Sequence, residues 1–345
     1  MHVRKSPAGV LVLVWAALSL PLAGPAEGND AKAAKSKHET AVAVEGGRSS
    51  LWSDPADLGT RNLFYGSGGS EHVPQGPFTF VKEDLKGTNP KFVVKDRNGV
   101  EWKVKLGNEA QPETVATRIV WAVGYFTDED YFVPELKVSG MPARLKRGQN
   151  LVEPGGTVRN VRLKHAPDGD KKAGIWRWRQ DPFIGTREWN GLRTLMAVIN
   201  NWDLKDINNA VYRKGTERVY LVTDLGASFG CTNRCWPEKS AKGNLEKYTV
   251  SRFIRRLTPD TVSFQTPGRS SYLYAVNPKE YFHRLHLEWI GRNIPRADAR
   301  WMGTLLARLS PQQIHDAFRA AGYSQAEIDG FSRVLSQRIA ALREL

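Results

Sequence analysis

Two short polar motifs on either side of a predicted hairpin constrain this chain most. Residues 201–208 read NWDLKDIN, with an Asp and an Asn five positions apart, and residues 222–226 read VTDLG. The turn Lys214-Gly215 and its apolar flanks predict a hairpin between the two motifs. A rigid hairpin can bring a base and two hard oxygen ligands into one small volume, as phosphate chemistry with a divalent cation requires.

The two motifs resemble the catalytic loop and the Asp-Phe-Gly motif of the protein-kinase-like superfamily. The resemblance implies that Asp203 orients or deprotonates an acceptor and that Lys205 neutralises charge on the transferred phosphoryl group. It also implies that Asn208 and Asp224 hold Mg²⁺ or Mn²⁺ against the phosphates of ATP or another nucleotide. Either motif alone also fits a solvated turn, so the order of the surrounding elements carries the prediction.

Three predicted strands precede the motifs. Segments 78–81, 92–95 and 101–106 have strand composition, and Asn98-Gly99 between the last two is a strong hairpin signal. Apolar and basic residues alternate strictly in the third segment, which predicts one buried face and one basic face.

The third strand of a kinase carries the Lys that grips the nucleotide phosphates, and the turn between the first two strands covers them. The resemblance therefore assigns nucleotide binding to Lys105 and places Gly87 and Thr88 in the covering turn. Lys103 lies on the same strand face as Lys105 and remains an alternative. Both lysines also fit an ordinary solvated strand face.

A predicted helix over residues 114–123 follows the third strand, with Pro112 in its first turn. Kinases pair the strand Lys with a Glu on this helix, which implies Glu113 as the partner and Glu109 as the reserve. A first-turn Glu also simply favours the helix dipole. The short spacing between Lys and helix is more similar to atypical branches, such as HipA-type, CotH-type or lipid-kinase-like proteins.

The remaining pattern predicts an α+β, bilobal protein-kinase-like fold. A β-rich N-lobe is expected over residues 76–165 and a mainly helical C-lobe over residues 166–345. Further strands are predicted at 131–133, 136–138 and 158–163, and helices at 188–200, 248–257, 278–290, 296–309, 311–321 and 325–345.

The N-terminus predicts export. A basic start and an apolar run over residues 10–22 indicate a signal peptide at residues 1–26, and an uncleaved anchor is the alternative. Residues 27–75, including a Gly-rich run, read as a disordered linker. The mature protein is expected to be periplasmic or extracellular, with no membrane span once the signal is removed.

The chain has 345 residues and a formal net charge of +14, which favours anionic partners without choosing among them. The prediction is an exported atypical kinase-like phosphotransferase whose acceptor is a protein, a glycan or a small molecule; nucleic acid is not expected. The alternatives are an inactive pseudokinase and an extracytoplasmic binding module for an anionic ligand or glycan. Two features depart from the kinase pattern. Asn201-Trp202 stands where kinases usually carry His-Arg before the catalytic Asp, and export would separate the protein from cytoplasmic ATP.

Three smaller patterns leave alternatives open. Cys231 and Cys235 predict either a local disulfide or two thiols. The aromatic–arginine run over residues 175–179 fits base stacking or, more commonly, core packing. His283 and His286, three apart on a predicted helix, fit either one metal ion in a hydrolase or ordinary polar packing.

Overall fold

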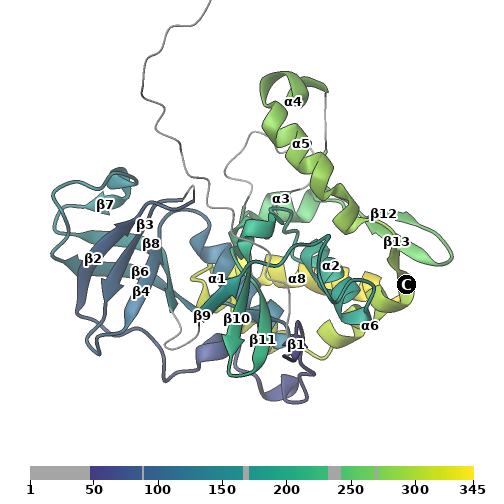
Figure 1. Cartoon of the computed structure of the whole chain (residues 1–345), viewed down its shortest axis with the longest axis horizontal. Helices are drawn as coiled ribbons and strands as arrows, with labels where there is room; N and C mark the ends of the chain where they lie inside the picture. Colours follow the sequence, from purple (N-terminus) through teal and green to yellow (C-terminus); the bar gives the residue numbers. More distant parts are fainter. Residues whose placement is uncertain (1–46, 88, 166–170, 232–241, 269–270) are drawn as a thin grey trace, which may run out of the picture. The chain divides into compact units, whose positions relative to one another are not determined.

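A computed structural model describes residues 47–87, 89–165, 171–231, 242–268 and 271–345 (Figure 1). All of these residues belong to one unit, Glu39–Leu345. The predicted signal peptide, the linker up to residue 46, Thr88 and Cys235 lie outside the described residues. Cys231 is disulfide-bonded.

The N-terminal part of the described chain contains a six-stranded sheet in the order β4-β3-β2-β6-β8-β7. A further pairing of β4 with β8 closes five of these strands into a barrel. The strands are β2 (Phe78–Asp84), β3 (Lys91–Lys95), β4 (Glu101–Lys105), β6 (Asp130–Ser139), β7 (Val152–Glu153) and β8 (Thr157–His165).

The hairpin predicted at Asn98-Gly99 joins β3 to β4. Gly99 has a φ of +79°, a conformation that glycine adopts without steric cost. The register places Lys91 of β3 opposite Lys105 of β4. Trp102 and Val104 point into the barrel core, so the strict alternation of β4 is confirmed.

Helix α1 (Ala110–Ala122) connects the barrel to the rest of the chain and packs on β6, β8 and α7 (Pro311–Ala320). Pro112 occupies its first turn, as predicted. Nearly every residue of α1 is buried, including Glu113. Helix α1 therefore links two parts of the described chain, because it contacts β6 and β8 of the barrel and contributes Val115, Ile119 and Val120 to the main hydrophobic core.

A second sheet contains the hairpin between the two polar motifs. Its order is β1-β11-β10-β9, with β5 beside β11. The strands are β1 (Ser49–Ser50), β5 (Phe126–Thr127), β9 (Lys171–Gly174), β10 (Asn209–Lys214) and β11 (Glu217–Val222). The predicted hairpin is confirmed as β10 and β11, which pair in antiparallel register from Asn209–Val222 to Lys214–Glu217.

The C-terminal part is mainly helical, which confirms the predicted α+β plan. A small sheet accompanies the helices, formed by β12 (Ile254–Leu257), β13 (Thr261–Phe264) and β14 (Ile294–Pro295). The remaining helices are α2 (Arg187–Val198), α3 (Leu245–Val250), α4 (Ser271–Val276), α5 (Pro278–Leu287), α6 (Arg296–Leu306) and α8 (Gln325–Arg343). In the described residues, no helix combines the length and apolar character needed to cross a bilayer.

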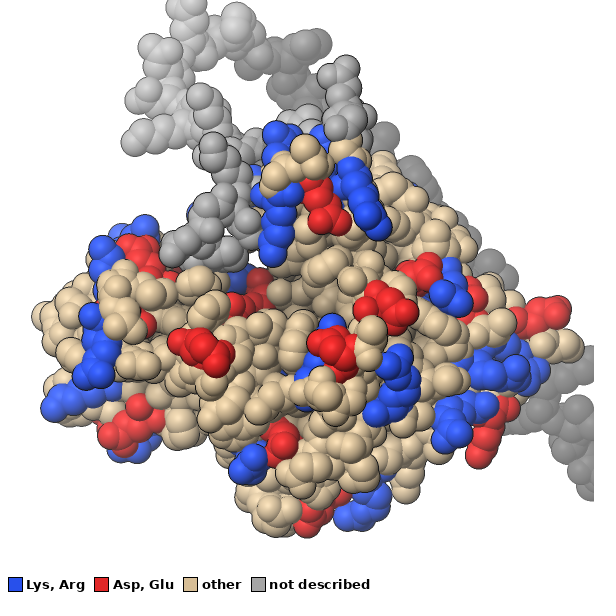
Figure 2. Space-filling model, turned by 90° about the horizontal axis from the view of Figure 1, so that it is seen from below, with Lys and Arg blue, Asp and Glu red and all other residues tan. Residues whose placement is uncertain are grey.

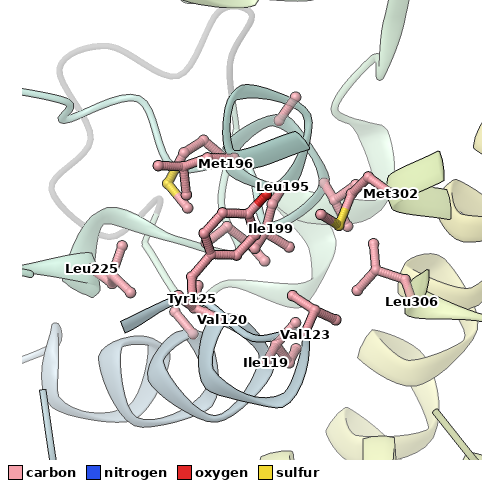
Figure 3. Close-up of a cluster of buried hydrophobic side chains, with 14 of the residues drawn as sticks. Ile119, Val120, Val123, Tyr125, Leu195, Met196, Ile199, Leu225, Met302 and Leu306 are labelled. Atoms are coloured by element: carbon pink, nitrogen blue, oxygen red, sulfur yellow. The ribbon is translucent and has the colours of Figure 1, made fainter. Parts of the chain in front are cut away.

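The main hydrophobic core forms where α1, α2 and α6 meet. Figure 3 shows Tyr125 and Val120 beside Leu195 and Met196 of α2, with Leu225 in the same cluster. Leu225 is the middle residue of the Asp-Leu-Gly motif and is only 1 % exposed. The second polar motif is therefore anchored by burial of its own apolar residue.

The predicted linker is wrong from residue 47 onward. Leu51, Leu58 and Leu63 are buried in the main core, and β1 adds a parallel strand beside β11. The indole nitrogen of Trp52 also donates to the carbonyl oxygen of Val123, at the end of α1. These residues lack helical or strand periodicity because they occupy 3₁₀ turns and loops, yet their apolar side chains still fill the core.

Two other local predictions are decided by the structure. The helix predicted over 248–257 is wrong in its second half, because α3 ends at Val250 and residues 254–257 form β12. The core interpretation of residues 175–179 is confirmed, since Trp176 and Trp178 are each 2 % exposed in the main core.

Candidate active site

Lys105 lies at the end of β4 and joins three chain segments through ion pairs. Its Nζ atom is 2.8 Å from Oε2 of Glu113 and 3.0 Å from Oε2 of Glu109, both next to or on α1. It is also 2.6 Å from Oδ1 of Asp224, at the end of the hairpin. The expected partner, the reserve partner and the second motif thus all meet at Lys105, which is 3 % exposed.

The ion pairs around Lys105 continue outward through further cations. Arg162 of β8 donates to the second carboxylate oxygen of Glu113 at 2.9 Å. Glu109 also accepts from Asn89 at 2.5 Å and pairs with Lys242. Each buried glutamate is therefore compensated by two cations, which is the condition for burying charge without a large penalty.

The electrostatic balance keeps this cluster charged. Burial alone would lower the pKa of Lys105, but Glu113 and Asp224 raise it well above its ordinary value. Burial alone would raise the pKa of Glu109, but Lys105 and Lys242 lower it. Lys105 is therefore a permanent cation that can be shared with an anionic ligand.

The loop that carries Asp203 is held by buried polar residues at the end of α2. Asn200 adopts a φ of +58°, and its amide donates to the carbonyl oxygen of Gly230 at 2.6 Å. The indole of Trp202 donates to Asn200, and the side chain of Asn201 accepts from the backbone N–H of Asp203 at 3.1 Å. Asn201-Trp202 therefore fixes the loop where kinases ordinarily carry His-Arg.

Asp203 faces two cationic or ionisable side chains. Its Oδ1 atom lies 2.6 Å from Nζ of Lys205 and 3.6 Å from Nε2 of His283. Burial alone would raise the pKa of Asp203, but His283 and Lys205 hold it well below its usual range. Asn208 donates its amide N–H to the backbone carbonyl of Asp203 at 2.9 Å, which ties the two ends of the motif together.

Asp224 and Asp203 come from different motifs but share one electrostatic environment. Burial alone would raise the pKa of Asp224; Lys105 lowers it overall, and the negative charge of Asp203 opposes that lowering. Asp224 itself lies in the left-handed region, with a φ of +55°. Such a conformation costs energy for a non-glycine residue, and it recurs at functional sites.

Gly226 explains why the second motif needs a glycine. A Cβ atom at this position would lie 2.7 Å from Cβ of Glu109. The backbone of the motif therefore packs directly on the ion cluster.

The predicted covering turn lies beside this cluster. Asn89 of the turn reaches Glu109, and Gly87 adopts a φ of +69° while its carbonyl oxygen accepts from Arg147 at 2.5 Å. The predicted role of Thr88 falls outside the described residues. Gly87 therefore shapes the turn, and its neighbour Asn89 makes the described contact with the site.

A lysine that sequence reasoning missed lies next to Lys105. Lys91 is opposite Lys105 in the ladder, and Lys103 lies 3.1 Å from Asp84. Burial lowers the pKa of Lys91, and the positive charges of Lys103 and Lys105 lower it further. The Asn98-Gly99 signal alone did not reveal this pair, because a two-residue turn would place residue 91 opposite residue 106, whereas the observed three-residue turn between Asp96 and Val100 places it opposite residue 105. The three lysines form a basic face beside Asp224.

Asn208 and Asp224 fit a divalent cation only if phosphate oxygens complete its coordination. In the described part of the chain, no three His, Cys, Asp or Glu side chains converge as a metal site. Asn208 uses its amide nitrogen on Asp203, which leaves its carbonyl oxygen as the donor atom, and Asp224 offers a carboxylate. Mg²⁺ typically takes one or two protein oxygens together with substrate phosphates and water, so this donor set suits a cation carried by a nucleotide.

The paired-histidine alternative is not supported. His283 faces Asp203, whereas His286 lines a separate cavity with Trp178 and Asp206. A larger cavity of about 670 Å³ is lined by Trp102, His165 and Leu221, among others, and by none of the predicted site residues.

Charge on the surface is mixed. Figure 2 shows lysine and arginine interspersed with aspartate and glutamate on the face in view. The net charge of the chain therefore does not locate an anion site on that face.

No family model matches the sequence, and no curated protein matches it. Among solved structures, the chain is similar to a Helicobacter pylori proinflammatory kinase, CtkA, at 12 % identity, covering 77 % of this chain and 96 % of that chain with a TM-score of 0.42. It is also similar to a Golgi casein kinase at 10 % identity, covering 79 % of this chain and 72 % of that chain with a TM-score of 0.34. Similarities of this size carry no argument about this chain, and the assignment of site residues rests on the contacts above.

Proposed function

We propose that this protein is an atypical kinase-like phosphotransferase that uses a nucleoside triphosphate with Mg²⁺ or Mn²⁺. The observation that carries the proposal is that Lys105 meets both Glu113, eight residues further along the chain, and Asp224, 119 residues further along, through contacts of 2.8 and 2.6 Å. Chance polar turns would not place a buried lysine between a helix carboxylate and the carboxylate that follows the hairpin.

The proposed roles follow from position and charge. Lys105, held by Glu113, contacts the donor phosphates, and Lys91 and Lys103 extend the same basic face. Asn208 and Asp224 would hold the divalent cation, which neutralises charge on the phosphates when it is bound. Lys105 now pairs with Asp224, so nucleotide binding requires these charges to be redistributed among phosphate, cation and protein.

Asp203 is proposed to orient the acceptor hydroxyl. Its carboxylate is held ionised, and it is only partly exposed, with a side-chain exposure of 31 %. Lys205, on the same loop, is placed to neutralise charge on the phosphoryl group as it transfers. Removing a single such contact typically costs about 10²–10³ in rate.

Thermal unfolding tests nucleotide binding directly. ATP with Mg²⁺ at about 100 times its Kd should stabilise the protein by about 2.7 kcal/mol. ATP with a chelator should stabilise it by a smaller amount. Asp224→Asn should lose the metal-dependent part of this stabilisation. Asp329→Asn, an exposed change on α8 with the same loss of charge, is the matched control. Full retention of the metal-dependent shift in Asp224→Asn would overturn the metal role.

Transfer is tested separately from binding. ATP labelled at the γ-phosphate should yield labelled protein or labelled acceptor, and Asp203→Asn should abolish transfer while keeping the thermal shift. Binding in the wild type without transfer to protein, glycan or small hydroxyl compounds would identify a pseudokinase. Absence of any nucleotide-dependent shift would favour a binding module for another anion.

We also propose that the protein is exported, on the basis of the basic and apolar segments at its N-terminus. The site would then act on nucleotide in an extracytoplasmic or host compartment, or on another phosphate donor. N-terminal sequencing of protein recovered outside the cytoplasm should begin near residue 27; recovery of the uncleaved chain from the membrane fraction would indicate an anchor instead.

A further inference from the structure

A small cavity lies beside the loop that carries Asp203. Its volume is about 190 Å³, which is smaller than pockets that hold whole organic ligands but sufficient for a carboxylate or phosphate group. Its wall includes Arg177, Trp178 and Arg179 of the aromatic–arginine run, together with Asp206, His286 and Trp289. The tryptophans of that run fill the main core, so its two arginines require a separate explanation.

Arg177 and Arg179 have no anionic partner in the described parts of the chain. The Nε atom of Arg177 is buried and lacks a hydrogen-bond partner there. The guanidinium of Arg179 lies over the ring of Trp289, 4.5 Å from its centroid. Stacking uses the flat face of a guanidinium, so its N–H edge stays available to a ligand. Both side chains carry a permanent positive charge into the same cavity wall.

The indole of Trp178 adds a further donor to this wall. The residue is 2 % exposed, and its Nε1 atom is buried without a partner among the described residues. An indole N–H can only donate, and buried polar groups in native proteins are almost always hydrogen-bonded. Asp206 supplies a carboxylate to the wall, and its Oδ1 atom accepts from the backbone N–H of Trp178 at 3.2 Å. Two arginine charges exceed this one negative charge, so the cavity suits an anion.

The turn that presents the arginines is fixed by its neighbours. The backbone N–H of Gln180 donates to the carbonyl oxygen of Arg177 at 3.0 Å and closes the turn. Trp176 and Trp178 pack edge to face in the main core, with ring centroids 4.9 Å apart. An anion would therefore bind to donors whose backbone is already ordered, which lowers the entropic cost of binding.

Two elements connect the cavity to the candidate catalytic aspartate. His286 follows His283 by three residues, a rise of about 4.5 Å along α5, and His283 lies 3.6 Å from Asp203. Asp206 follows Asp203 by three residues in the loop, so their Cα atoms are at most about 11 Å apart. A group bound in the cavity can thus belong to the same acceptor whose hydroxyl meets Asp203.

Exposed apolar side chains border this surface. Ile207, next to Asp206 in the loop, is 70 % exposed. Phe282 and Leu285 of α5 are exposed as well, each next to one of the two histidines of that helix. Exposed apolar groups that lie together on a surface indicate a site for a protein partner. An acceptor with both acidic and apolar groups is a polypeptide rather than a glycan.

We propose that the cavity lined by Arg177, Trp178 and Arg179 binds an acidic side chain of a polypeptide acceptor, with glutamate and phosphoserine as the chemical types. Guanidinium groups match both oxyanions, because paired N–H donors meet two oxygens in parallel. Binding of the oxyanion is independent of the proposed phosphotransferase function, whereas its role in acceptor choice rests on that function.

Thermal unfolding with inorganic phosphate tests the cavity by itself. At equal ionic strength, phosphate should stabilise the wild type more than chloride does. The double variant Arg177→Gln/Arg179→Gln should bind phosphate about 10–100-fold more weakly, and Arg177→Lys/Arg179→Lys should recover only part of the loss because lysine lacks the paired donors. Arg333→Gln, a change of an exposed arginine on α8, is the matched control and should behave as the wild type.

Phosphate could also meet the lysines of the nucleotide site, and Lys105→Met separates the two locations. This variant should keep the phosphate-dependent shift. A shift that persists in Arg177→Gln/Arg179→Gln but is lost in Lys105→Met overturns the anion site. Circular dichroism verifies that each variant is folded before the titration.

Acceptor choice is tested with serine peptides that carry glutamate, phosphoserine or glutamine at one flanking position at a time. With ATP and Mg²⁺, kcat/KM should be at least about tenfold higher for an acidic residue than for glutamine at one position. The double glutamine variant should abolish this preference through a higher KM. Equal transfer to acidic and glutamine peptides, or transfer to an acidic polysaccharide alone, overturns the role in acceptor choice. A wild-type protein that binds phosphate in the cavity but gives no shift with ATP overturns the proposed function and supports the anion site.

Discussion

Replacing Lys105 by methionine tests the ion cluster on which the candidate site depends. Methionine keeps the length and apolar stem of the side chain but removes the charge. In the folded protein, Lys105 compensates two buried glutamates and the partly exposed Asp224, whose side chain is 44 % exposed. The substitution therefore leaves one negative charge uncompensated in a buried cluster that is otherwise balanced.

The size of the effect follows from the partners that remain. Breaking a buried ion pair from one side costs about 3–5 kcal/mol. Glu113 keeps Arg162, Glu109 keeps Lys242, and Asp224 can turn toward water. The loss should thus fall at the lower end, at about 3 kcal/mol of unfolding free energy.

Urea unfolding at pH 7, followed by both fluorescence and circular dichroism, measures this loss. Lys103→Met is the matched control, because Lys103 lies on the same strand, is 42 % exposed and pairs with Asp84. That exposed pair should contribute less than about 1 kcal/mol. A Lys105→Met variant that is no less stable than Lys103→Met would refute the view that buried charges hold the site together.

Two further changes test specific contacts. Gly226→Ala should destabilise the protein by about 1–3 kcal/mol and weaken nucleotide binding, because the new methyl group would lie 2.7 Å from Cβ of Glu109; unchanged urea and nucleotide titrations would contradict this. Burial raises the pKa of Asp181 to about 6, and its Oδ2 atom has no partner among the described residues. The folded-state pKa lies above the unfolded value of about 4, so the ionised carboxylate lowers stability as pH rises through this range. Asp181→Asn keeps an oxygen that accepts from the backbone N–H of Phe183. It should raise the free energy of unfolding by about 1–3 kcal/mol above pH 6 and leave it unchanged at pH 4. An equal change in stability at both pH values would exclude the ionised carboxylate as the cause.

Much of the candidate site follows from local patterns that the structure brings together. The strand alternation predicted Lys105 on a face opposite the barrel core, and the resemblance to kinases implied Glu113, in the first turn of the next helix, as its partner. The hairpin between the two motifs predicted that Asp203 and Asp224 come close, and their charges do interact. These features are readable because alternation, turn residues and first-turn preferences are short-range effects of the backbone.

Other members of the site depend on long-range packing. Arg162 reaches Glu113 only because β4 pairs with β8 across the barrel, and Lys242 reaches Glu109 from the chain that follows the second motif. His283 faces Asp203 from a helix eighty residues away. No local pattern indicates such partners, because several registers and helix positions are compatible with the same short-range signals.

The amino-acid order alone specified the strands, the hairpin and the carboxylates at its two ends, because side-chain periodicity and turn chemistry act over a few residues. It did not show that Leu51, Leu58 and Leu63 belong to the core, or that Lys105 would be shared among three carboxylates. Those features exist only once distant segments are packed. Packing determines which apolar side chains are buried, and it removes the water that would otherwise screen the charges from one another.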